Sequence, residues 1–311
     1  MKKAYLQISF AWLFAIIVGA FILFLAIYAS TKMISNNKYQ LDVETAKNIE
    51  VLLNPLETGY ESATVTSMSL PRETRIYNKC ENYTQFGSQT ISVSQKSLNR
   101  WSETSDGSSI SNKYIFSTNP VEGKKFYLFA KPFEFPFKTG DVIYLTSASD
   151  FYCFKDADEE IENEISRLKE NNPGLNIGVF PNCSKESINV CFGTGSCEIN
   201  VDYFDKEVRK NSKKMYFESD ALMYAAIFSE VENYECQVQR LMQRTAQLAE
   251  LYKEKENIIS NQGCEKRLSS DLTNLISLTE KLDSSADLKG IWDLAENIQL
   301  KNERAQQCRL W

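Results

Sequence analysis

The stretch FAWLFAIIVGAFILFLAIYA, from Phe10 to Ala29, decides how this chain is organised. Its twenty residues carry no charge and no proline, and Gly19 is the only glycine among them. At about 1.5 Å per residue, a helix of this length spans about 30 Å and matches the hydrocarbon core of a bilayer. We therefore expect a transmembrane helix. The alternative is a cleaved secretory signal, but such signals have an apolar run of only about 7–15 residues and a small residue before the cleavage site.

The flanks of this stretch predict its orientation. Lys2 and Lys3 precede it, so the positive-inside rule places the N-terminus in the cytoplasm and the chain beyond about residue 32 outside the cell membrane. We therefore predict a single-pass membrane protein that has the lipid bilayer as one of its partners. Asn82 and Asn182 begin glycosylation sequons. All eight cysteines fall on the external side, where disulfides persist, and are disulfide candidates: Cys80, Cys153, Cys183, Cys191, Cys197, Cys236, Cys264 and Cys308.

The helical pattern continues beyond the membrane segment, through residues 33–57. No proline or glycine interrupts it until Pro55, and Asn36-Asn37 is the expected position of a kink. We predict a nearly continuous helix of roughly 45–50 residues, with its second half laid against an external domain. The side chains expected to form its loose apolar stripe are Ile34, Leu41, Ala46, Ile49, Leu52 and Leu53.

The first thirty or so residues resemble the amino terminus of archaeal type IV pilin-like proteins with a class III signal peptide. In that family, basic residues and a small residue precede a Gln that opens the apolar helix. Lys2, Lys3, Ala4 and Gln7 stand in the matching places of MKKAYLQISFAW. Tyr5 and Leu6 separate Ala4 from Gln7, and Ala11 stands where many members carry Glu. The resemblance implies a single-pass subunit, processing before the helix, and assembly by packing of these helices.

Residues 58–218 are expected to form an external α+β domain with a mostly antiparallel sheet, because short alternating apolar runs are separated by Ser, Asn, Asp and Gly. One helix, Ala157–Lys169, interrupts the strands and ends before Asn172-Pro173-Gly174. The candidate strands are Ala63–Leu70, Arg75–Cys80, Thr90–Ser94, Lys113–Phe116, Lys125–Phe129, Asp141–Thr146, Asn176–Phe180, Ser187–Phe192, Cys197–Tyr203 and Lys214–Phe217.

Two patterns in this domain are typical of metal sites, but each has an alternative that we favour. A calcium loop starting at Asp156 would need Gly and Glu where Ile161 and Arg167 stand, so the acidic tract is better explained by the dipole of the helix that it opens. Cys183, Cys191 and Cys197 could bind zinc together with Cys153. Their gaps of seven and five residues do not fit the usual C-x₂₋₄-C pairs, which favours disulfides.

An extended segment, KPFEFPFK, places three phenylalanines on one face: Phe133, Phe135 and Phe137. Pro132 and Pro136 limit its pairing to a sheet edge. Such a stripe could dock a partner, although burial in the core is the more common use.

Residues 219–311 are expected to form a helical hairpin or three-helix bundle. Gly263 separates the first helix from a second over Lys266–Asp283, and a third follows. With these lengths, Cys308 finishes close to Cys264, so we predict that disulfide, and Cys236 is left to join a cysteine of the external domain. A heptad seam typical of a coiled coil runs along the first helix through Ile227, Val231, Tyr234, Val238, Leu241, Thr245, Leu248 and Tyr252.

The composition narrows the function. The chain has no histidine, which excludes Ser-His-Asp and Cys-His catalysis and His-ligated metals, and its net charge of −6 disfavours nucleic acid. We expect a non-enzymatic, pilin-like structural subunit that self-assembles or binds a protein partner, with no cofactor, metal or small-molecule substrate. One alternative is a tethered scaffold protein that binds a partner through the seam or the phenylalanine stripe. Another is an external hydrolase with paired carboxylates, for which no residues can be named.

Overall fold

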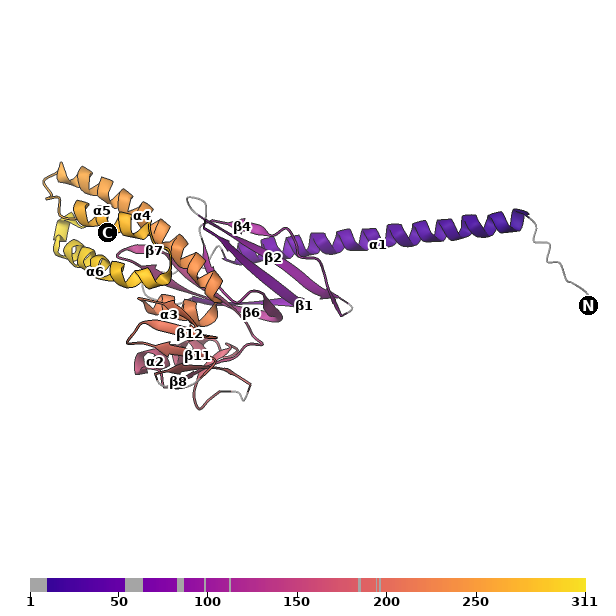
Figure 1. Ribbon diagram of the computed structural model, residues 1–311, viewed down its shortest axis with the longest axis horizontal. Helices are drawn as coiled ribbons and strands as arrows, with labels where there is room; N and C mark the ends of the chain where they lie inside the picture. Colours follow the sequence, from indigo (N-terminus) through magenta and orange to yellow (C-terminus); the bar gives the residue numbers. More distant parts are fainter. Residues whose placement is uncertain are drawn as a thin grey trace, which may run out of the picture.

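A computed structural model describes residues 10–53, 64–82, 87–97, 99–111, 113–183, 186–193, 195 and 197–311. The protein is α+β: an N-terminal apolar helix projects from two β-sheets, and the C-terminal helices lie against the sheets on the side away from the free end of that helix (Figure 1).

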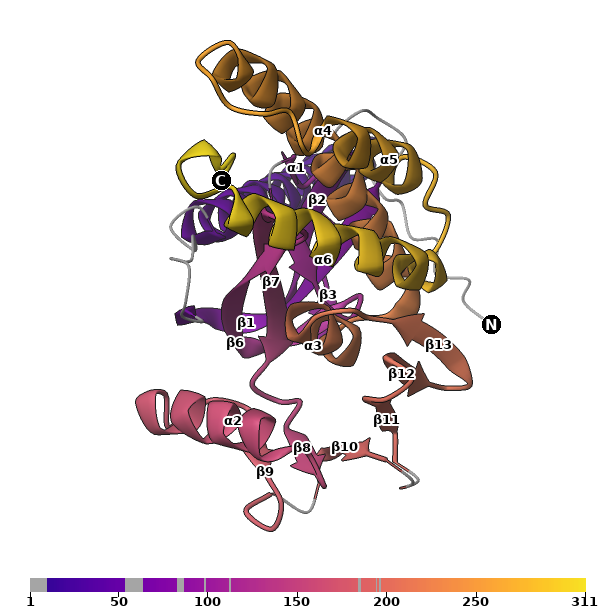
Figure 2. The ribbon, with the colours of Figure 1, turned by 90° about the vertical axis from the view of Figure 1, so that its left-hand side faces the viewer.

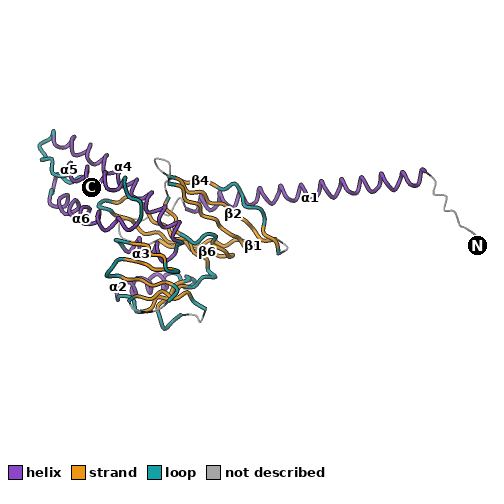
Figure 3. The backbone as a smooth tube through the Cα atoms, in the orientation of Figure 1, coloured by secondary structure: helices purple, strands orange, loops and turns teal. Residues whose placement is uncertain are grey.

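The first helix, α1, runs without interruption over Phe10–Leu53 and is 44 residues long. It passes straight through Asn36-Asn37, so the kink that we expected there is absent (Figure 3). Its C-terminal half lies on the first sheet, where Ala46 and Ile49 are buried as the apolar stripe predicts. The side chains of the other four stripe residues, Ile34, Leu41, Leu52 and Leu53, lie outside the described part of the chain.

The first sheet has seven strands, and all of its pairs are antiparallel except β5 with β7. Two of the predicted strands form one continuous strand, β1. Pro71 lies between them, at the point where β1 shifts its register against β6, and does not end the strand. The path runs β3-β2-β1-β6-β7-β5, with β4 paired to β2. The bounds are β1 Thr64–Glu81, β2 Ser88–Ser97, β3 Arg100–Trp101, β4 Ser108–Ile110, β5 Tyr114–Phe116, β6 Val121–Glu134 and β7 Lys138–Ser147.

Both faces of the first sheet are covered. Along β6, Phe126 and Leu128 belong to the core beneath α1, whereas Tyr127 and Phe129 belong to the core shared with the second sheet and the C-terminal helices. This alternation follows from the two-residue period of a strand. The sheet therefore lies between α1 on one side and the C-terminal helices on the other.

The second sheet was not anticipated as a separate unit, and it is mixed rather than antiparallel. Its order is β13-β12-β11-β10-β8-β9, and the pairs β8–β9, β8–β10 and β10–β11 are parallel. Helix α2 makes the crossover between β8 and β9, as a parallel pair requires. The bounds are β8 Tyr152–Lys155, α2 Glu159–Asn171, β9 Ile177–Val179, β10 Ile188–Phe192, β11 Ile199–Asp202, β12 Glu207–Lys210 and β13 Lys213–Tyr216.

Helix α3 (Asp220–Phe228) joins the two sheets. Its residues from Ala221 onward are all buried, and the Phe228 ring contacts Phe129 and Tyr144 of the first sheet and Tyr152 of the second. Extended backbone at Ser229 and Glu230 ends this helix. The helix predicted to continue from Asp220 is therefore two helices, and the seam residue Ile227 lies on α3.

The remaining helices are α4 (Val231–Ser260), α5 (Ser269–Thr279) and α6 (Leu288–Arg304), with short 3₁₀ turns η1 (Ser285–Asp287) and η2 (Gln306–Cys308). Figure 2 shows α6 passing in front of β7, with the second sheet and α2 below it. Their apolar residues share one hydrophobic core with the two sheets and α3.

Candidate functional site

The exposed half of α1 is the first candidate site. Phe10–Met33 is long and apolar enough to cross a membrane, and it is in contact with no other described part of the chain. Large apolar side chains such as Phe14, Phe21 and Phe24 stand in the open. A helix of this kind can serve as a membrane anchor or as a signal sequence.

The docked half of α1 joins that apolar rod to the first sheet. Ala46 and Ile49 are each 1% exposed and pack in the core that contains Ile91 and Val93 of β2. The Gln95 amide of the same strand donates a hydrogen bond to the Thr45 hydroxyl at 3.1 Å. The helix is continuous from the apolar rod to these contacts, so the exposed half is held in a fixed direction relative to the sheet.

The eight cysteines form four disulfides, and no described cysteine is free. Cys264 is bonded to Cys308, as the helix lengths predict. Cys236 of α4 is bonded to Cys80 of β1, so it joins a cysteine of the external domain as expected. The other two pairs are Cys153–Cys183 and Cys191–Cys197, which leaves these four sulfurs engaged with one another rather than with zinc. Disulfides are typical of an oxidising, extracytoplasmic environment.

The surfaces that the scaffold hypothesis needed are covered by the chain itself. Tyr234, Val238 and Leu241 of the seam are fully buried in the core shared by both sheets and the C-terminal helices, and Val231, Leu248 and Tyr252 pack against that core. The phenylalanine stripe is also buried. Phe135 contacts Trp292 of α6, and Phe137 contacts Tyr252 of α4 and the C-terminal Trp311. Neither surface is free to bind a partner.

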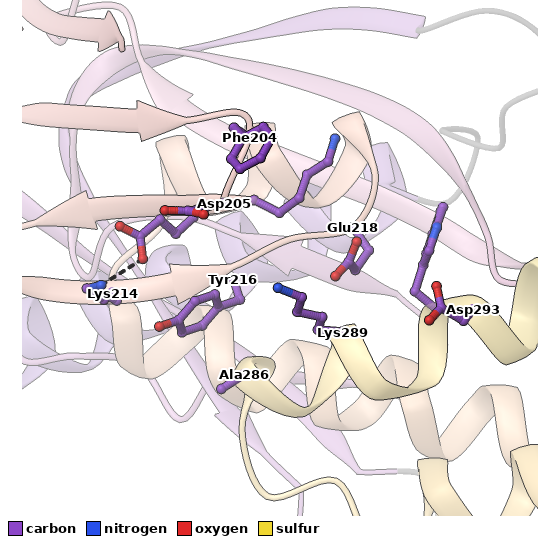
Figure 4. Close-up of a pocket in the computed structure, with 11 residues that line it drawn as sticks. Phe204, Asp205, Lys214, Tyr216, Glu218, Ala286, Lys289 and Asp293 are labelled. Carbon is purple, nitrogen blue, oxygen red and sulfur yellow. Dashed lines mark ion pairs between the residues drawn. The ribbon is translucent and has the colours of Figure 1, made fainter. Parts of the chain in front are cut away.

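A cleft of about 520 Å³ lies between the β12–β13 hairpin and the start of α6 (Figure 4). Ser285 of η1 fixes this junction: its hydroxyl accepts from the Tyr216 backbone N–H of β13 at 2.9 Å and donates to the Glu235 carboxylate of α4 at 2.7 Å. Phe204, in the β11–β12 turn, is 95% exposed at the rim. Trp292 of α6 provides a second aromatic wall.

The charges around this cleft are mixed: Lys206, Lys214 and Lys289 stand with Asp205, Glu207, Glu218 and Asp293. Burial raises the pKa of Glu207, but hydrogen bonds from Lys214 and Arg209 outweigh it and lower the pKa overall. Burial raises the pKa of Glu218, and this rise is only partly offset by Lys206 and Lys289. Glu207 is thus committed to ion pairs within the sheet, whereas Glu218 holds a proton more readily than an ordinary glutamate.

The remaining candidates from the sequence are placed as follows. Asn182 is exposed, whereas the Asn82 amide is partly buried and donates to Gln239 of α4. The acidic tract forms the first turn of α2, with Glu159 and Glu160 where the helix dipole favours them. No cluster of three His, Cys, Asp or Glu residues suited to a metal ion occurs in the described ranges.

Sequence reasoning missed the cleft altogether, because its walls come from a hairpin and a helix about 80 residues apart in the chain. The exposed Phe204, in the turn Asp202-Tyr203-Phe204-Asp205, was the one local signal for it. No family model matches the chain, and no curated protein or solved structure is significantly similar to it.

Proposed function

We propose that this protein is a single-pass, membrane-anchored surface subunit of the pilin-like kind, with its N-terminus in the cytoplasm and the sheets and C-terminal helices outside the cell. Its role is structural and non-enzymatic. One observation carries the proposal: a single helix combines a fully exposed apolar half with a half that docks on a largely antiparallel sheet.

The physical argument concerns what the exposed half of α1 can contact. A bare apolar helix of 24 residues is unstable in water, so it needs lipid or other apolar helices around it. The same helix can be stored in a bilayer as a monomer and packed against copies of itself in an assembly. The four disulfides support an external location for the rest of the chain.

Crosslinking tests this assembly, because every described cysteine is already in a disulfide. Ala26→Cys puts a single thiol in the exposed half of α1, and Ser149→Cys puts one in an exposed loop of the first sheet as the matched control. With a membrane-permeable bismaleimide, which joins two thiols, we expect covalent dimers from Ala26→Cys but not from Ser149→Cys. The proposal fails if Ala26→Cys yields only monomer and the native protein keeps an intact Met1 end with no filaments in the medium.

The aromatic cleft favours a second candidate function, a tethered binding protein. Phe204 and Trp292 offer apolar faces beside several charged groups, which suits a polar ligand with one apolar side. Phe204→Ala would then abolish retention of the ligand on cells while leaving α1 crosslinking unchanged. Equal retention by the variant and the native protein would exclude this candidate.

A further inference from the structure

A second cleft, of about 300 Å³, lies where α4 passes the edge strand β5 and the start of β7. Arg240 and Arg244, one turn apart on α4, form one wall. Tyr114 and Gly140 form part of the opposite wall, and the Tyr114 ring lies so close to Gly140 that a Cβ there would approach it to 2.9 Å. Neither the seam nor the proposed assembly through α1 uses this cleft.

Arg240 is fully buried, with 0% of its surface exposed. Its guanidinium donates to three neutral oxygens: the Lys113 carbonyl at 3.1 Å, the Gln237 side chain at 2.8 Å and the Ser111 carbonyl at 2.8 Å. A guanidinium has five N–H donors, so three bonds leave two unused. The Nε atom has no hydrogen-bond partner in the described part of the protein.

The positive charge of Arg240 is therefore uncompensated. No ion pair between Arg240 or Arg244 and a carboxylate occurs in the described ranges, although the chain has 41 acidic residues. Burial lowers the pKa of Arg240, but an arginine side chain stays protonated in proteins. Contact with the Tyr114 ring, 5.1 Å from the guanidinium carbon, is a weak substitute for an anion.

Arg244 makes this arrangement more unfavourable. Two like charges four residues apart on a helix repel each other, and both of these face the same cleft. Within the described residues, the Arg244 side chain makes one hydrogen bond, a long one of 3.4 Å to the Gln247 amide oxygen, so its other donors are available there. An anion in this cleft would convert this repulsion into two attractions.

The backbone at Gly87 accommodates the Arg240 side chain. Gly87 has a left-handed φ of +57°, and a Cβ on it would lie 2.7 Å from the Arg240 Cγ. The absence of a side chain at position 87 therefore leaves room for the Arg240 side chain where it crosses toward the cleft. If Arg240 only braced the loop carbonyls of Ser111 and Lys113, a neutral donor would do so without burying a charge.

We propose that this cleft binds a doubly charged oxyanion, either free phosphate or sulfate or the phosphate group of a small ester. Two guanidinium groups match two negative charges, and arginine forks fit tetrahedral oxyanions well. The Tyr114 side chain lines the same cleft and offers a hydroxyl donor. The volume leaves room for a substituent on the anion.

Isothermal titration calorimetry on the full chain in non-ionic detergent tests the proposal, with sodium phosphate, sodium sulfate and a hexose monophosphate as titrants at constant ionic strength. We expect saturable one-to-one binding of phosphate or sulfate. Arg244→Gln should weaken it about 10- to 100-fold, since a hydrogen-bonded charge is lost. Arg167→Gln is the matched control, because it removes an exposed arginine of α2 that donates only to its own helix. Tighter binding of the hexose monophosphate than of phosphate would identify an ester as the ligand, and a response to phosphate or sulfate but not to the hexose monophosphate would identify the free ion.

A stability measurement separates a binding role of Arg244 from a structural one. In chloride alone, Arg244→Gln should unfold at the same temperature as the native chain or at a higher one, because the repulsion is relieved. Phosphate should then raise the unfolding temperature of the native chain and of Arg167→Gln more than that of Arg244→Gln. The proposal is overturned if none of the three titrants gives saturable heat, or if Arg244→Gln binds them as tightly as the native chain does.

Discussion

Removal of the Cys80–Cys236 disulfide, in the double variant Cys80→Ala/Cys236→Ala, is the most informative perturbation of the external domain. This bond joins the end of β1 to the first turns of α4, so it fastens the C-terminal helices to the sheet on which α1 docks. The matched control is Cys191→Ala/Cys197→Ala, which removes a bond that spans only the short connection between β10 and β11.

The expected magnitudes follow from the lengths of chain that each bond closes. Loss of loop-closure entropy in the unfolded chain makes the Cys80–Cys236 bond, with its separation of 156 residues, worth about 5 kcal/mol of unfolding free energy. The same relation gives about 2 kcal/mol for the six-residue separation of Cys191 and Cys197. The two losses should therefore differ by about 3 kcal/mol.

Urea denaturation of both double variants and the native chain, in the same detergent and followed by tryptophan fluorescence, measures these losses. The reasoning requires the Cys80/Cys236 variant to lose more free energy of unfolding than the Cys191/Cys197 variant, with similar urea dependence. Equal losses, or a larger loss in the Cys191/Cys197 variant, would refute it. In that case the long bond would be constraining a part of the chain that stays ordered after unfolding.

Three further outcomes are expected, each measurable by urea denaturation. Ile49→Ala should lower the unfolding free energy by about 2–4 kcal/mol through the cavity under α1, and Ile27→Ala in the exposed half should not. Lys210 donates to the Ile227 and Ser229 carbonyls, and burial lowers its pKa to about 7 from an ordinary 10.5. Because the unfolded chain binds the extra proton between these values, stability should rise with pH from 7 towards 10 by at most about 1.4 kcal/mol per unit, and Lys210→Met should lose this rise. Glu256 accepts from the Arg267 and Leu268 N–H groups, both at 2.7 Å, and hydrogen bonds lower its pKa despite burial. Glu256→Gln should cost about 2–3 kcal/mol at pH 7, and the difference from the native chain should shrink as pH falls below the lowered pKa.

The sequence predicts well those parts of the fold that depend only on the length of a helix and on its rise per residue. The apolar run from Phe10 defines a helix by its length alone, and the helix continues to Leu53 because no proline or glycine intervenes after Gly19. The Cys264–Cys308 bond follows from the constant rise per residue along successive helices. Neither inference needs knowledge of the pairing between distant strands.

The division into two sheets could not be predicted, because it depends on pairing between distant strands. Strands β8 and β12 are only four residues each, YCFK and EVRK, and neither has a clear alternation of apolar and polar residues. Their assignment to a second sheet is set by α2, which carries the chain from β8 to a parallel neighbour, and by α3, which occupies the space between the sheets.

The two arginines show why the oxyanion cleft was also missed. Arg240 and Arg244 each precede a seam residue, so the heptad pattern places them beside the seam and predicts that they face solvent. That prediction assumes that α4 packs against a single helix, which would cover only the seam itself. The partner of α4 includes a sheet, which is wider than a helix, and the positions beside the seam are covered as well.

The same geometry bears on how the proposed subunit would carry load. A force along α1 enters the first sheet through the contacts of Ala46 and Ile49 with β2, and passes by hydrogen bonds to β1. At the end of β1 it meets Cys80, whose covalent bond to Cys236 leads directly into α4. Non-covalent packing alone would have to connect the opposite faces of the sheet if this bond were absent. The disulfide with the largest sequence separation, Cys80–Cys236, therefore lies where the anchored helix and the C-terminal helices would otherwise separate.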